Sequence, residues 1–131
     1  MEVRAIAKSV RISPRKLRLV ADAVKHMPID KAYGVLEVTH KRAAGIFQKT
    51  LKSAVANAVT NAKLDSANLL IASVMINDSA PLKRFHPSTR GRIHPYKKRG
   101  SHLTIILKEK TTTAPVMKIV KKKEEKKEDK K

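Results

Sequence analysis

The chain has 131 residues, of which 30 are lysine or arginine and 11 are aspartate or glutamate, so its formal net charge is +19. That charge exceeds what solubility requires and indicates a polyanionic partner, most commonly a nucleic acid. With 41% hydrophobic residues the chain can bury a small core, and without cysteine it can form neither disulfides nor thiolate metal sites. No signal peptide or membrane-spanning run is recognisable. We therefore expect one small basic domain in the cytoplasm.

A strand and a helix are predicted near the start of the chain. Residues 3–8 alternate between small apolar side chains and larger ones, which is typical of a short strand with one packed face and one face toward a partner. Ser13 followed by Pro14 predicts a helix start, because serine is a good N-cap residue and proline tolerates the first helical position. Apolar residues continue at three- and four-residue spacing, and we expect this helix to end at Met27-Pro28.

Two more helices are predicted before residue 64. Asp30 is expected to cap a short helix that runs through Leu36. Residues 41–63 show the strongest helical periodicity, with one apolar stripe that consists of Ile46, Phe47, Leu51, Val55, Ala58, Val59 and Ala62. We expect this long helix to form the centre of the core.

Two strand-like runs follow the long helix. Residues 69–77 form a nearly continuous apolar run, which predicts a strand buried on both faces. Residues 101–108 alternate between apolar and other side chains and predict an antiparallel return strand. Their separation is unusual, because connections inside a compact domain are normally a handful of residues long.

The connection, residues 81–100, is the most informative segment of the chain. It contains no acidic residue and holds seven cations, which are Lys83, Arg84, Arg90, Arg92, Lys97, Lys98 and Arg99. If it continues the two strands as a ribbon of about ten residues per arm, it reaches about 30 Å. Gly91 then supplies the reversal at the tip, and Pro87 and Pro95 suggest a splayed, unpaired end.

These elements predict an α+β fold, in which a small three-stranded antiparallel sheet packs on three helices and a long β-hairpin protrudes. The domain is expected to span residues 1–113, with the extended hairpin at 81–100. Residues 114–131 are rich in lysine and glutamate and predict a disordered tail.

The sequence offers no chemistry of catalysis. Its five histidines lack metal-ligand spacing and have no cysteine partners, so we expect no metal site. The acidic residues before the tail form no obvious pair, and the four glycines make no phosphate-binding loop. We therefore expect no enzyme activity, no cofactor and no small-molecule substrate.

Several separated motifs resemble one protein family. Residues 11–22 (RISPRKLRLVAD) are similar to the opening helix of the L-twenty-two family of large-subunit ribosomal proteins, bacterial type. Residues 53–58 (SAVANA) with Asn61 resemble its long helix, and residues 90–92 (RGR) followed by 98–105 (KRGSHLTI) resemble its hairpin signature. The resemblance covers roughly residues 3–108.

The resemblance implies a structural protein of the large ribosomal subunit. Such a protein binds 23S-type ribosomal RNA, aids its assembly, and lines the nascent-peptide exit tunnel with its hairpin. Its partners are the RNA, neighbouring ribosomal proteins and the nascent polypeptide, without a membrane. The implied hairpin tip consists of Thr89, Arg90, Gly91, Arg92 and Ile93. The RNA-binding candidates are Arg11, Arg15, Lys16, Arg18, Lys83, Arg84, Arg90, Arg92, Lys97, Lys98, Arg99, Ser101 and His102.

Two segments depart from the family pattern. Residues 25–27 (KHM) lack the usual glycine after the first helix, and the hairpin has Ser88 where a basic residue is common and IHPY at residues 93–96. These departures concern the first turn and the geometry of the hairpin tip.

Two other functions agree with a strongly basic chain. An architectural DNA-binding protein could lay a β-ribbon in a minor groove, with Ile93 or Pro95 as a wedge between base pairs. A cationic protein of the membrane surface is less consistent with the sequence, because no amphipathic helix with an aromatic-rich face is present.

Overall fold

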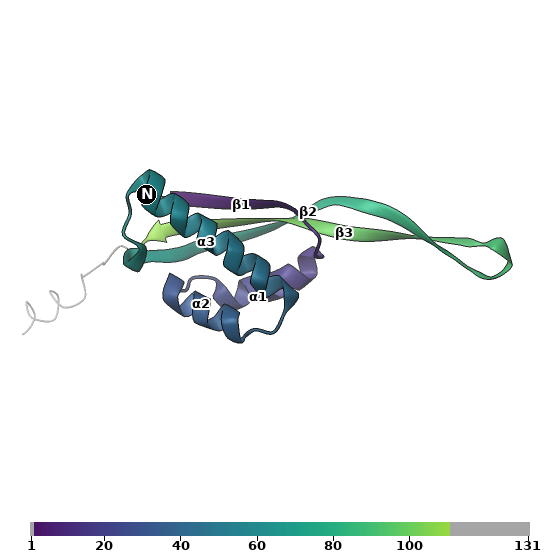
Figure 1. Cartoon of the computed structure of the whole chain (residues 1–131), viewed down its shortest axis with the longest axis horizontal. Coiled ribbons are helices and arrows are strands. Elements are labelled where there is room, and N and C mark those ends of the chain that lie inside the picture. The colour runs from purple at the N-terminus through teal and green to yellow at the C-terminus, as the bar shows by residue number, and fades with distance from the viewer. Residues whose placement is uncertain (1, 111–131) are drawn as a thin grey trace, which may run out of the picture.

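The computed structural model describes residues 2–110 and shows a three-stranded antiparallel sheet covered on one face by three helices (Figure 1). The strand order is β1-β3-β2. The elements in chain order are β1 (Glu2–Val10), α1 (Pro14–Val24), α2 (Ile29–Val38), α3 (Arg42–Ala62), η1 (Ser66–Asn68), β2 (Leu69–Pro87), η2 (Thr89–Gly91) and β3 (Ile93–Glu109). The predicted fold class is confirmed, while the tail predicted from residue 114 lies outside the described residues.

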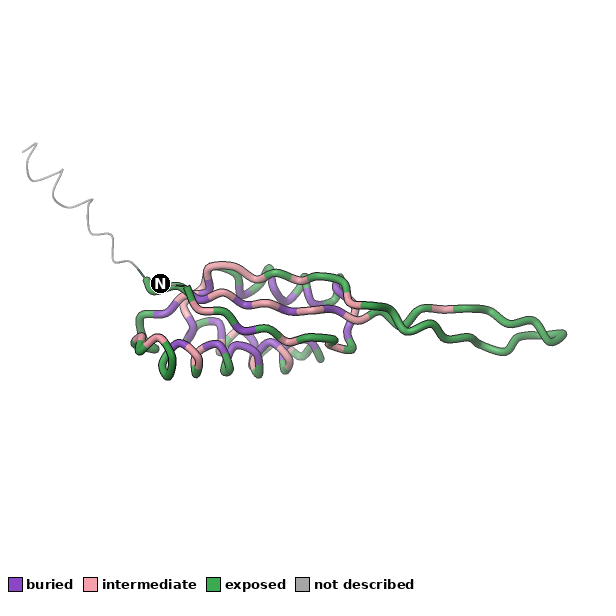
Figure 2. The backbone as a smooth tube through the Cα atoms, turned by 90° about the horizontal axis from the view of Figure 1, so that it is seen from above, coloured by how far each residue is buried: buried purple, intermediate pink, exposed green. Residues whose placement is uncertain are grey.

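The core lies between the helices and the central strand β3. Side chains of β3 alternate, so that Leu103, Ile105 and Leu107 are fully buried and face the helices. Figure 2 shows the buried positions gathered in this layer, on the body alone. On α3, Phe47 and Leu51 fill the space above the sheet, and buried alanines before and after them, Ala44 and Ala54, let the helix pack closely on β1 and β3.

Two predictions of burial were wrong. Residues 69–77 are buried on one face only, and Met75 is 47% exposed, because the helices cover just one side of the sheet. On α3, Val59 was assigned to the apolar stripe and is also 47% exposed. The buried residues of this helix are Ala43, Ala44, Phe47, Thr50, Leu51, Ala54 and Ala58, so the prediction was right for Phe47, Leu51 and Ala58.

The predicted start of α1 is confirmed, while the other helix ends differ. Ser13 is the N-cap residue and Pro14 the first helical residue, although the Ser13 side chain makes no capping hydrogen bond, and α1 already ends at Val24. Asp30 does not cap α2. The N-cap residue is Pro28, and no side chain forms a capping hydrogen bond at this end of the helix. Asp30 lies instead in the first turn, where its negative charge interacts favourably with the positive end of the helix dipole.

The turn after α1 adopts the conformation of a glycine without containing one. His26 has φ of +62°, in the left-handed region that is costly for most side chains. Two backbone hydrogen bonds attach this turn to β2, one from the His26 amide to the Ile71 carbonyl (3.1 Å) and one from the Ile71 amide to the Met27 carbonyl (3.0 Å). These bonds compensate for the strained backbone.

Beyond the body, β2 and β3 continue as a two-stranded ribbon, and we call residues 81–100 the arm (Figure 1). Pairing extends from Leu82 opposite Lys98 to Pro87 opposite Ile93. Gly91, with φ of +71°, helps the chain reverse at the tip.

The expected splayed end at Pro87 and Pro95 was therefore wrong. Both prolines stand in the ladder, Pro87 opposite Ile93 and Pro95 opposite Phe85. These two pairs are two residues apart along the ribbon, and every second residue of an antiparallel pair directs its N–H away from the partner. A proline at such positions loses no ladder hydrogen bond.

We predict that the body and the arm respond differently to truncation of side chains. Leu103→Ala should lower the free energy of unfolding of the full chain by about 2–5 kcal/mol, because it leaves a cavity in the core. Arg90→Ala combined with Arg92→Ala should change it by less than about 0.5 kcal/mol, because both side chains are exposed. Thermal and urea unfolding measure both, and a large loss from the arginine pair would mean that the tip packs on the body.

Candidate nucleic-acid interface

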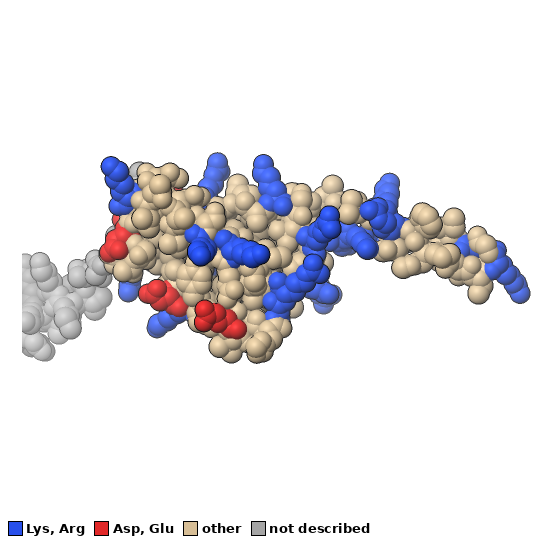
Figure 3. All heavy atoms as spheres, in the orientation of Figure 1, with Lys and Arg blue, Asp and Glu red and all other residues tan. Residues whose placement is uncertain are grey.

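All seven cations of the arm are exposed to solvent. Figure 3 shows lysine and arginine side chains along the arm and no acidic side chain on it. In the sequence, Asp78 and Glu109 enclose a stretch without any carboxylate. The arm therefore carries a concentrated positive charge that nothing in its own sequence neutralises.

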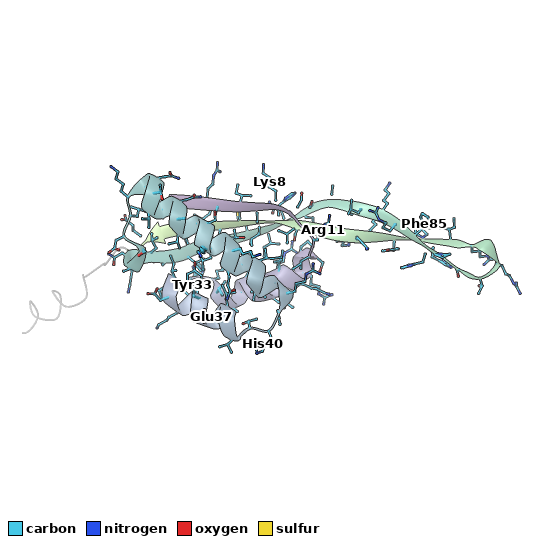
Figure 4. The ribbon with its side chains drawn as sticks, viewed as in Figure 1. Lys8, Arg11, Tyr33, Glu37, His40 and Phe85 are labelled. Atoms are coloured by element: carbon cyan, nitrogen blue, oxygen red, sulfur yellow. The ribbon has the colours of Figure 1, made fainter. Side chains whose placement is uncertain are left out.

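A hollow of about 860 Å³ lies where the arm leaves the body. It is lined by the end of β1, the start of α3 and the first residues of the arm, and its cations are Arg11, Arg42, Arg84, Lys98 and Arg99. Figure 4 shows Arg11 at this junction. Gly100 permits the close approach of the strands here, since a Cβ at this position would lie 3.1 Å from the carbonyl oxygen of Val10.

A second hollow of about 510 Å³ adjoins the first, because Arg11 and Arg42 line both. It also contains Lys16 and Lys41, and it lies between the first turns of α1 and α3. Neither helix has an acidic residue in its first turn, so the positive ends of both helix dipoles add to the charge of the side chains. We call the two hollows together the basic groove, whose cations are Arg11, Lys16, Lys41, Arg42, Arg84, Lys98 and Arg99.

The basic groove joins residues that are distant in the sequence. Of the predicted RNA-binding residues it contains Arg11, Lys16, Arg84, Lys98 and Arg99, while Lys83, Arg90, Arg92 and Lys97 lie elsewhere on the arm. Arg15 is exposed on α1 and lines neither hollow. Sequence reasoning missed Lys41 and Arg42. The signal was a basic pair at the start of the long helix, where acidic residues are usually preferred.

Two cations are held by carboxylates of the body. Arg18 donates to the carbonyl oxygen of Ile76 (3.3 Å) and lies 3.8 Å from Asp78, so it attaches α1 to β2. Lys108 lies 2.8 Å from Glu2 on the neighbouring strand. This hydrogen bond and charge lower the pKa of Glu2.

The cations of the groove and of the arm are not neutralised in this way. Within residues 2–110, none of them has a carboxylate oxygen within 4.0 Å. Their charge is available to a partner. Arg18 is therefore a weaker RNA-binding candidate than its neighbours on α1.

Ser101 and His102 have structural contacts that the sequence did not reveal. The Ser101 side chain is fully buried and its hydroxyl donates to the carbonyl oxygen of Ile12 (2.7 Å), so in this structure the hydroxyl has a partner within the body and is not exposed to a ligand. His102 is half-buried, and its Nδ1 accepts a hydrogen bond from the amide of Ser9 (3.1 Å) at the irregular end of β1. Its Nε2 is then the protonated nitrogen of the neutral ring.

The part of the chain that the structure describes offers no group of three or more metal-ligating side chains. In the same residues, no helix is both long and apolar enough to cross a membrane.

The chain is similar to ribosomal proteins over most of its length. Residues 5–108 match the family model described as ribosomal protein L22p/L17e. The large ribosomal subunit protein uL22 of Clostridium novyi is 48% identical over 110 residues, which cover 84% of this chain and 99% of that protein. Those of Oceanobacillus iheyensis and Mycoplasmopsis pulmonis are 43% and 44% identical over 110 residues, again 84% of this chain, and 97% and 100% of their own lengths.

Because Ser101 is buried, we predict that its substitution changes the stability of the protein but not its affinity for nucleic acid. Ser101→Ala should lower the free energy of unfolding by about 1–3 kcal/mol, because the buried carbonyl of Ile12 loses its donor. The affinity of the folded protein for nucleic acid should stay unchanged, since the hydroxyl does not reach the surface. Unfolding curves and binding titrations below the melting temperature measure the two, and weaker binding by stable protein would contradict the structural role.

Proposed function

Since this chain belongs to the ribosomal protein L22p/L17e family, we propose that it binds 23S-type ribosomal RNA through the basic groove and the arm. Membership makes it a structural component of the large ribosomal subunit, located in the cytoplasm within the ribosome, and not an enzyme. The proposal further assigns it a part in assembling the RNA and in lining the nascent-peptide exit tunnel.

The observation that carries the proposal is uncompensated positive charge both in the groove and at the tip of the arm, with no carboxylate in the sequence between them. A groove with seven cations can bind several phosphates of one RNA fold, and the arm extends the same charge away from the body. Contacts to the backbone position a protein without reading base sequence. Specificity then comes from the shape of folded RNA, which suits a protein with one structured site.

The mixture of arginine and lysine suits an irregular RNA surface. Arginine presents a planar group that can bind two phosphate oxygens or stack on an unpaired base. Lysine carries a compact charge on a flexible stem and follows a phosphate whose position varies. The groove and the arm contain both types, with arginine predominating in the groove.

The shape of the molecule supports a position of the arm inside the subunit. Within the arm only Tyr96 and Gly100 are half-buried, and every other residue is exposed. A ribbon of this kind can pass between RNA helices while the body stays at the outer surface beside neighbouring ribosomal proteins. The tip, from Thr89 to Ile93, would then reach the tunnel wall and meet the nascent polypeptide, with Arg90 and Arg92 exposed.

The binding of RNA through the groove can be tested by removing two of its charges. Arg42→Ala with Lys98→Ala should weaken binding of the full chain to large-subunit RNA by about tenfold, at roughly 0.5–1 kcal/mol for each exposed contact. The dependence of affinity on salt should also flatten by about one unit of slope per phosphate contact. Filter binding at several salt concentrations measures both quantities.

The matched control changes the same number of charges outside the groove. Lys25→Ala with Lys31→Ala removes two exposed cations of the body and should leave affinity and salt dependence nearly unchanged. Equal effects of the two pairs would show that net charge alone drives binding. Equal or tighter binding to bent duplex DNA would favour the architectural DNA-binding function instead.

A further inference from the structure

One of the two phenylalanines and one of the two tyrosines of the chain lie on the arm. Phe47 is buried in the core and Tyr33 packs against it, whereas Phe85 is 66% exposed and Tyr96 lies on the ribbon beyond the body. Aromatic residues on a two-stranded ribbon gain little of the burial that makes them stabilising. Packing within the chain therefore does not explain why the arm carries aromatic side chains.

The register of the arm sorts its side chains onto two faces. Cross-strand partners share a face, and so do residues two positions apart on one strand. Arg84 stands opposite Tyr96, and His86 stands opposite His94. One face, which we call the planar face, therefore carries four planar side chains: Arg84, His86, His94 and Tyr96. The other, the apolar face, carries Phe85, Pro87, Ile93 and Pro95 beyond the pair of Lys83 and Lys97.

Two rings of the planar face are already stacked. The ring centroids of His86 and Tyr96 are 4.2 Å apart, and their planes differ by 10°. These residues are diagonal neighbours across the ribbon, a spacing that aromatic side chains can bridge. His86 remains exposed. A third planar ring can therefore continue the stack without any rearrangement of the first two.

We infer that the planar face is a stacking site for an unpaired RNA base, which lies on the His86 and Tyr96 pair. This inference rests on the proposed function, because it requires RNA along the arm. Lys98 shares the planar face and can hold the adjacent phosphate. Stacking on aromatic rings tolerates any base and is the usual way in which proteins bind bases splayed out of folded RNA.

The chain provides its own reporter for this contact. It has no tryptophan and only two tyrosines, so Tyr33→Phe leaves Tyr96 as the single tyrosine. In that background, binding of large-subunit RNA to the full chain should quench the fluorescence of Tyr96. Tyr96→Leu should weaken binding by about five- to 150-fold, the range measured for one stacked base. Tyr96→Phe should retain the affinity, because the ring remains.

Salt dependence separates stacking from charge. Tyr96→Leu removes no charge, so the slope of affinity against salt should stay as in the unchanged protein, whereas Lys98→Ala should lower it. Phe85→Leu is the matched control on the apolar face and should leave affinity nearly unchanged. Circular dichroism of each variant checks that the body is folded.

The outcomes distinguish this inference from the proposed function. If RNA binds with normal affinity while Tyr96 emission and the Tyr96→Leu variant show no effect, the stacking site is refuted and RNA binding by the groove stands. Loss from Phe85→Leu alone would place the base on the apolar face and refute the assignment. If the fluorescence of Tyr96 is quenched by a nascent peptide and not by RNA, the ligand of the planar face is a polypeptide, and the stacking site for an RNA base is refuted. Failure of the unchanged chain to bind RNA would overturn both proposals.

Discussion

The arm has no hydrophobic core of its own, and this constraint governs the whole molecule. Pairing of β1 with β3 ends at Val10 opposite Ser101, so only two strands continue outward and no helix covers them. A two-stranded hairpin is marginally stable in water by itself, and adjacent cations add repulsion. An RNA surface that neutralises the charge and covers both faces would remove both costs. Under the proposed function, the body supplies the direction of the arm and bound RNA would supply much of its stability.

The direction of the arm is determined by the central strand. β3 runs without interruption from Ile93 to Glu109, so the same strand that is buried in the body also forms one side of the arm. The two edge strands have irregular register near this junction, β1 between Ala7 and Val10 and β2 between Ser79 and Leu82. Such bulges bend and twist a strand locally. They lie beside the basic groove, so the geometry that aims the arm also shapes the groove.

The sequence predicted features that depend on neighbouring residues, such as strand alternation and the start of a helix. It did not predict contacts between segments that are distant in the sequence. The alternation around Leu103 and the pair of Ser13 and Pro14 depend on local geometry, and both predictions were confirmed. Burial of β2 on one face depends on how many layers cover the sheet, which an apolar run does not reveal. The buried Ser101 hydroxyl donates a hydrogen bond to Ile12, a residue 89 positions away in the sequence. Arg42 joined the candidate site only because the starts of two helices meet.

The distribution of charge differs between the arm and one side of the body. Acidic side chains lie over α2, where Asp30 and Glu37 belong to the helix, whereas the arm carries only basic charged side chains (Figure 3). Long-range attraction to a polyanion therefore acts most strongly on the arm and the groove and is weakened at α2. A potential of several kT orients an encounter before contacts form, so under the proposed function we expect the RNA to approach the arm and the groove first. The same asymmetry leaves α2 as the side of the body least suited to lie against phosphate.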